Sequence, residues 1–138
     1  MALIGYREKA ARRNAIASDH APVDDDAKQL PFAEAAPGAT ALELLLPLTL
    51  KWAAEERIAL PRALACITSR AGAIMNVAGA GRIDAGGPAD LCVFDAEAPW
   101  RVERQALRSQ GKNTPYLGLE LQGMVRFTLV GGRVVHEA

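Results

Sequence analysis

The chain has 138 residues, of which half are apolar and 23% are charged, the size and composition of a single soluble globular domain. Sixteen basic and sixteen acidic residues cancel, so no basic surplus is present to hold a phosphate backbone, and we expect no nucleic-acid partner. The longest apolar run, residues 42–52, contains Glu43 and Lys51 and is too short to cross a bilayer. Since residues 1–13 lack the apolar core of a secretory signal, we expect a cytoplasmic protein without a membrane partner.

The first stretch of interest is a short apolar run that ends in polar residues. Residues 2–14 look weakly helical and basic, and residues 15–18 have the pattern of a buried strand followed by Asp19, His20 and Pro22. In α/β barrels the loops that follow the strands carry the chemistry, which makes Asp19 the first functional candidate. The alternative is that Asp19 and His20 begin an ordinary loop, with Pro22 ending the strand.

The next segment is polar and then turns. Residues 24–26 are three successive aspartates, but a calcium loop needs spaced oxygen ligands, a central glycine and a closing glutamate, which are absent. We therefore expect a solvated loop or the start of a helical turn there. Residues 36–40 form a second turn, in which Gly38 permits backbone geometry or a close approach that a side chain would forbid.

Two helices should follow. Thr40 as N-cap with Glu43 three residues later has the pattern of a capping box, and apolar residues at helical spacing continue to about Arg57, with Pro47 expected to kink or weaken the helix. Leu60 and Pro61 restart a helix whose apolar stripe runs to Met75. Neither helix carries catalytic side chains on one face, so both are expected to serve packing.

Strands dominate after Val77, where glycines punctuate the chain. Residues 89–95 are a short apolar strand and residues 100–102 are a possible partner for it. Residues 125–129 alternate before Gly131 and Gly132, the pattern of a hairpin closed by a two-residue turn. We therefore divide the chain into residues 1–79, mainly helical, and residues 80–138, mainly strands.

Cysteine and histidine, the residue types that most often bind zinc, are few in this sequence. Cys66 and Cys92 lie far apart in unlike surroundings and are interpreted as free buried thiols of a reducing compartment. The only histidines are His20 and His136, so no zinc site is indicated by spacing.

Four motifs together carry a resemblance to a known family. In order and spacing they resemble the C-terminal third of dihydroorotases of the amidohydrolase superfamily, from about residue 15 to the end; they are residues 18–22 (Ser-Asp-His-Ala-Pro), Pro37-Gly38 with Leu42-Glu43, residues 86–91 and residues 111–115. The resemblance implies an α/β fold, a C-terminal slice of a (β/α)8 barrel followed by strands of a small β-sandwich. It also implies a zinc-dependent family that interconverts dihydroorotate and carbamoyl aspartate in pyrimidine biosynthesis.

The resemblance also assigns roles to individual residues. Asp19 matches the family's metal ligand and general base, and Pro37 and Gly38 match a loop that contacts substrate. Active relatives usually have a histidine that helps to hold the substrate where this chain has Val23, and valine neither hydrogen-bonds nor carries charge. The family's other metal ligands precede this segment, so we expect no cofactor in this chain and treat Asp19 as a vestigial base, because one carboxylate cannot hold a catalytic zinc.

The resemblance leaves three hypotheses about the function of the chain. Val23 followed by the three aspartates resembles the non-catalytic dihydroorotase-like subunits that accompany aspartate carbamoyltransferase, and this is the reading we favour. The chain would then be such a pseudoenzyme, or a natural or excised piece of one, with aspartate carbamoyltransferase or a second copy as partner. Retained Asp19 instead suits the C-terminal part of an active dihydroorotase that completes its site with a separate N-terminal portion. A degenerate fragment of a hydantoinase-like or allantoinase-like relative is the third reading, disfavoured by residues 112–115.

Overall fold

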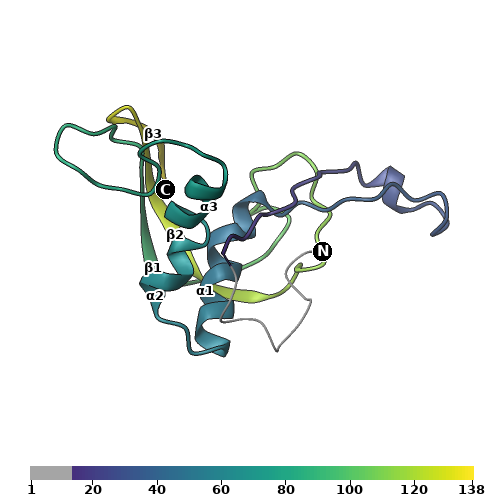
Figure 1. Cartoon of the computed structure of the whole chain (residues 1–138). Coiled ribbons are helices and arrows are strands. Elements are labelled where there is room, and N and C mark those ends of the chain that lie inside the picture. The colour runs from purple at the N-terminus through teal and green to yellow at the C-terminus, as the bar shows by residue number, and fades with distance from the viewer. Residues whose placement is uncertain (1–13) are drawn as a thin grey trace.

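The structure is a computed structural model that describes residues 14–138, and it consists of short helices packed on a small antiparallel sheet (Figure 1). The helix expected within residues 2–14 lies almost wholly outside the described residues. In chain order the helices and strands are η2 (Asp26–Lys28), η3 (Leu42–Leu44), α1 (Leu45–Glu55), α2 (Leu60–Ala65), α3 (Ser69–Ile74), β1 (Leu91–Arg101), β2 (Glu120–Val130) and β3 (Arg133–Glu137).

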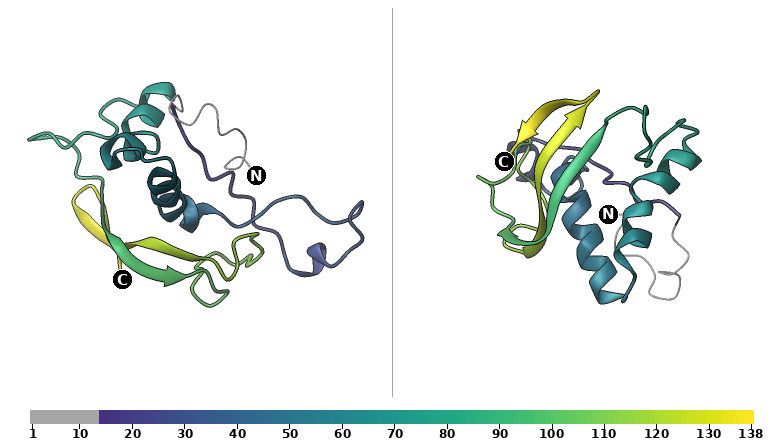
Figure 2. Two further views of the ribbon diagram at one scale, coloured as in Figure 1. Left: turned by 90° about the horizontal axis from the view of Figure 1, so that it is seen from below. Right: turned by 90° about the vertical axis from the view of Figure 1, so that its left-hand side faces the viewer.

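The strand expected at residues 15–18 is not formed. Residues 14–22 form neither a helix nor a strand, and backbone hydrogen bonds of this stretch run from Ile16 N to Cys66 O and from Ala21 N to Ala39 O, each 3.0 Å. A strand needs a neighbouring strand to exchange hydrogen bonds with, and β1, β2 and β3 pair only with one another. The segment instead runs beside the helices as an extended chain, and residues 24–36 reach away from the rest of the molecule (Figures 1 and 2).

The first expected helix begins differently from its sequence pattern. Thr40 and Glu43 do not form a capping box, because the cap residue is Ala41, without a side-chain bond, and a turn of 3-10 helix precedes α1. Pro47 lies in the first turn of α1, where the missing N–H costs no helical bond, so the expected kink is absent.

The second expected helix is two helices. α2 and α3 are separated by a turn at residues 66–68, where Thr68 leaves helical geometry at φ −131° and ψ −100°. At this turn the Cys66 carbonyl accepts a hydrogen bond from the N–H of Ile16, in the distant extended segment.

The sheet has the order β1-β2-β3, and its hairpin is the one that the sequence predicts. Gly131 and Gly132 form the two-residue turn with φ of 54° and 78°, and Val130 pairs with Arg133, so this prediction is confirmed. Residues 100–102 are not a partner of residues 89–95; both belong largely to β1, which pairs with β2. The Asp95 carboxylate accepts hydrogen bonds from Glu97 N and Ala98 N, and this local turn accounts for the register shift before Pro99.

One apolar core joins the helices to the sheet. Its buried members are contributed by the start of the helical region, by the connection between β1 and β2, and by β2 itself: Leu44, Leu48, Val102, Leu107 and Leu121. Gly123 of β2 faces α1 at its closest approach, where a Cβ would lie 2.5 Å from Leu50 Cδ1. None of the helices within residues 14–138 is both long and apolar enough for a membrane crossing.

Candidate functional site

Three of the four motifs meet in space. The loop that follows the extended segment, the turn at Pro37 and Gly38, and residues 111–115 lie against one another, although they come from distant parts of the sequence. Gly38 and Gly111 allow this approach, because a Cβ on Gly38 would lie 2.5 Å from Ala21 O and a Cβ on Gly111 would lie 3.0 Å from both Val23 N and Val23 O.

Hydrogen bonds fasten the second and third loops together. Thr40 is fully buried, its N–H donates to Asn113 O over 2.7 Å, and its hydroxyl donates to Gly111 O. Asn113 Nδ2 lies 3.4 Å from Gly38 O. Asn113 thus joins this loop to the Pro37-Gly38 turn, which is held through its backbone.

Glu43 ties the start of the helices to the connection between β1 and β2. Its carboxylate accepts hydrogen bonds from Arg108 N, from Ser109 N at 2.8 Å and from the Ser109 hydroxyl at 2.6 Å. Partial burial on its own would raise the pKa of Glu43, but these hydrogen bonds, aided by the charge of Lys112, lower it below the ordinary value of 4.5. Glu43 is therefore a charged structural anchor.

Asp19 and His20 occupy the end of the extended segment. Asp19 is exposed and has φ of 49°, a left-handed conformation uncommon for residues other than glycine. His20 Nδ1 accepts hydrogen bonds from Ala41 N and Leu42 N, both 3.1 Å long, at the start of η3. His20 was not among the site residues expected from the sequence, since its bonds join residues more than twenty positions apart.

Val23 is half-buried between the two glycine turns. Its Cγ2 lies 3.0 Å from the point where a Cβ of Gly38 would stand. This position, where the resemblance expects a substrate-holding histidine, is occupied here by an apolar packing contact.

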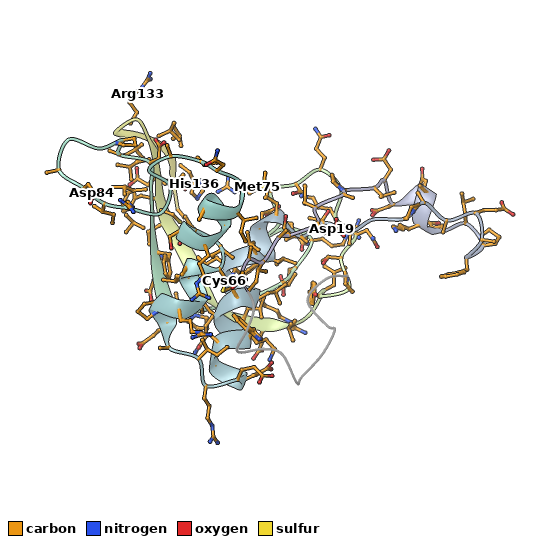
Figure 3. All side chains as sticks on the ribbon, in the orientation of Figure 1. Asp19, Cys66, Met75, Asp84, Arg133 and His136 are labelled. Atoms are coloured by element: carbon orange, nitrogen blue, oxygen red, sulfur yellow. The ribbon has the colours of Figure 1, made fainter. Side chains whose placement is uncertain are left out.

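The residues that bind metals are not gathered. Within residues 14–138 no group of three or more histidine, cysteine, aspartate or glutamate side chains is placed to hold an ion, and His136 lies in β3, far from Asp19 (Figure 3). Asp19 alone does not fit a zinc site. Neither cysteine forms a disulfide. Cys66 is buried as expected, but Cys92 is exposed, contrary to expectation, and the partial desolvation of its thiol raises its pKa.

The fourth motif lies elsewhere. Pro88, Asp90 and Leu91 of this motif border a mainly apolar cavity of about 640 Å³ between the helices and β1. Its lining also includes Leu64, Ile67, Ile83 and Phe94 and the polar residues Thr68 and Arg82. Gly86 lies in a turn.

Sequence comparison relates the chain to dihydroorotases. It is 39% identical over 121 residues to a dihydroorotase of Syntrophotalea carbinolica, a match that covers 88% of this chain and 28% of the relative. It is 42% identical over 122 residues to a dihydroorotase-like protein of Pseudomonas putida, again 88% of this chain and 28% of the relative. The chain thus spans little more than a quarter of the length of these curated relatives.

Solved structures and the family match give the fold. A D-hydantoinase (dihydropyrimidinase) from Thermus sp. superimposes with a TM-score of 0.83 at 20% identity, covering 94% of this chain and 30% of that one. Another D-hydantoinase superimposes with a TM-score of 0.78 at 24% identity, covering 90% of this chain and 28% of that one. The expected fold, a partial slice of an amidohydrolase, is confirmed. The family model described as "Amidohydrolase family" matches residues 13–136, and the chain therefore belongs to the amidohydrolase family.

Proposed function

We propose that the chain is the C-terminal portion of a dihydroorotase-like protein of pyrimidine biosynthesis that does not itself catalyse hydrolysis. The observation that carries the proposal is Val23. Where active dihydroorotases present a histidine to the substrate, this chain places an apolar side chain packed against Gly38, with its backbone against Gly111. Valine offers neither a hydrogen bond nor a charge to an anionic cyclic amide.

The partner in this proposal is aspartate carbamoyltransferase. Its support is the resemblance of Val23 and the aspartates at 24–26 to non-catalytic subunits of such assemblies. Residues 24–26 are exposed and lie on the segment that reaches away from the rest of the molecule, and are thus accessible to a partner (Figure 1). Co-sedimentation with purified aspartate carbamoyltransferase of Pseudomonas putida tests it, and we expect a complex at low micromolar concentration.

A second candidate is the C-terminal part of an active, zinc-dependent dihydroorotase. Asp19 favours it, because an exposed carboxylate in a left-handed conformation at the end of an extended segment is suited to reach a metal or accept a proton. The dihydroorotase of Geobacter metallireducens, 39% identical over 124 residues, also carries the name of the active enzyme.

A chimera distinguishes the two candidates. In the dihydroorotase of Syntrophotalea carbinolica, the matching 121-residue segment is replaced by that of this chain, and zinc content and dihydroorotate hydrolysis are measured. The first candidate predicts that zinc is retained while kcat/KM falls about 10- to 100-fold, the loss expected for a missing charged hydrogen bond.

Two variants of the chimera complete the test. Val23→His should restore hydrolysis, and Val23→Ala, which also removes the valine side chain but adds no polar group, should not. A chimera that hydrolyses at the parent rate with Val23 in place would support the second candidate. The isolated chain should show no turnover and no stoichiometric zinc under either candidate.

A further inference from the structure

The start of the helical region is capped by a side chain from another part of the chain. The first N–H groups of a helix have no partner within it, and a side chain at the N-cap usually supplies one. Here the N-cap of η3 is Ala41, which has no polar side chain to offer. The Ala41 and Leu42 N–H groups donate instead to His20 Nδ1, both over 3.1 Å.

These two bonds indicate which ring nitrogen carries the proton in the neutral imidazole. A ring nitrogen that accepts hydrogen bonds carries no proton, so the proton of the neutral ring lies on Nε2. A serine, threonine, aspartate or asparagine at the N-cap would accept from N–H groups two or three residues further on, whereas His20 accepts from those of the N-cap Ala41 and of Leu42. His20 does so across 21 residues of sequence, and so it joins the extended segment to the helices.

We propose that His20 is a positioning residue, which fixes Asp19 in its left-handed conformation by fastening the next residue to the start of η3 and α1. The backbone on both sides supports this: Ala21 N donates to Ala39 O and Ile16 N donates to Cys66 O, each over 3.0 Å. A left-handed non-glycine residue persists only where its surroundings determine it, and the cap acts at the adjacent residue. The inference rests on the proposed function only in making Asp19 the residue of interest, and it requires neither metal nor turnover.

The test begins with the tautomer. The chain has only two histidines, so a His136→Gln variant leaves His20 as the single imidazole in a long-range ¹H–¹⁵N spectrum. We expect at pH 7.5 an unprotonated Nδ1 and a protonated Nε2. A proton on Nδ1 would overturn the proposal, and this measurement needs no change at His20.

The variants then separate positioning from folding. In His20→Ala the amides of Ala41 and Leu42 should exchange with solvent about fivefold faster or more, and the three-bond HN–Hα coupling of Asp19 should shift from its left-handed value. His20→Asn should retain both, since an asparagine Oδ1 can stand near the position of Nδ1 and accept the same two hydrogen bonds.

Three outcomes would contradict the role of His20: exchange unaltered in His20→Ala, an Asp19 coupling that does not change in that variant, or an asparagine variant that behaves like alanine. If His20→Ala does not fold, the tautomer and the asparagine variant still decide. None of these readouts depends on hydrolysis, so an inactive chimera would leave the inference standing.

Discussion

The sequence pattern correctly predicts that the Glu43 carboxylate accepts hydrogen bonds, but it predicts the wrong donors. Its spacing from Thr40 predicts a capping box, yet both side chains are used by residues 108–111, more than sixty positions away. A local pattern reports which groups can bond within one turn, and it contains nothing about a competing loop. Asp19 was a candidate from its place at the end of an apolar run, whereas Val23 was found only through family resemblance, and the roles that the resemblance assigns to both stay predictions.

We predict that Glu43→Gln destabilises the chain by about 1–2 kcal/mol, because hydrogen bonds to a charged acceptor are worth more than those to a neutral amide. Urea denaturation followed by circular dichroism measures the change. Glu55→Gln is the matched control: Glu55 forms an exposed pair with Lys51 at 2.7 Å, and its loss should cost no more than about 0.5 kcal/mol. Equal effects of the two substitutions would contradict the anchoring role.

The same carboxylate makes stability depend on pH. Because the pKa of Glu43 is lower in the folded chain than the ordinary value of 4.5, its contribution is fully present above pH 4.5 and is lost as the pH falls through the folded value. The difference in stability between Glu43→Gln and the unaltered chain should therefore be constant from pH 6 to pH 7.5 and shrink below pH 4.5. A difference that grows on acidification would mean that the sign is wrong.

Among the elements, the β2–β3 hairpin was predictable and the helices were predictable only in part. Two consecutive glycines between alternating apolar residues determine the turn locally, as both have positive φ. The break between α2 and α3 was not predictable, because it coincides with a long-range contact, the hydrogen bond from Ile16 N to Cys66 O, that no local pattern contains. The sequence predicts two strands, residues 89–95 and 100–102, where the structure has the single strand β1. Pro99 and the turn at Asp95 interrupt the apolar pattern, although the strand continues through them.

The contact between α1 and β2 should tolerate no side chain at Gly123. Gly123 has φ of 104°, and a Cβ there would lie 2.5 Å from Leu50 Cδ1. We predict that Gly123→Ala costs about 2–4 kcal/mol, the sum of steric overlap and backbone strain. Gly79→Ala is the control for strain alone, because Gly79 has φ of 75° and open space around its Cβ position, and it should cost about 1 kcal/mol.

A double variant separates the two terms at Gly123. Leu50→Ala removes the overlapping methyl group, so Gly123→Ala should cost less in that background than in the unaltered chain. Thermal unfolding of the four proteins of this cycle gives the coupling directly. Strict additivity would show that strain at Gly123, and not contact with Leu50, dominates.

The whole molecule exposes apolar side chains on its sheet. Val93 is 48% exposed, Val134 56% and Val135 61%. β3 is an edge strand among the described residues, and unpaired strand edges readily pair with other chains. We predict self-association in dilution series by sedimentation velocity, weakened by Val134→Lys but not by Ile83→Lys, which changes an exposed apolar residue, 86% exposed, in the loop before β1. A monomer throughout the low micromolar range would contradict this expectation.

The shared core has a consequence for how the chain loses its structure. Leu44 and Leu48 pack with Val102 and Leu121, so neither the helical part nor the sheet retains its buried surface without the other. We therefore predict that the two parts into which the sequence divides the chain, residues 1–79 and 80–138, unfold together in one cooperative step. The chain supplies its own reporters, because one of its two tryptophans, Trp52, lies in α1 and the other, Trp100, lies in β1. Fluorescence of Trp52 in a Trp100→Phe variant and of Trp100 in a Trp52→Phe variant should each change at the same denaturant concentration as the circular dichroism of that variant.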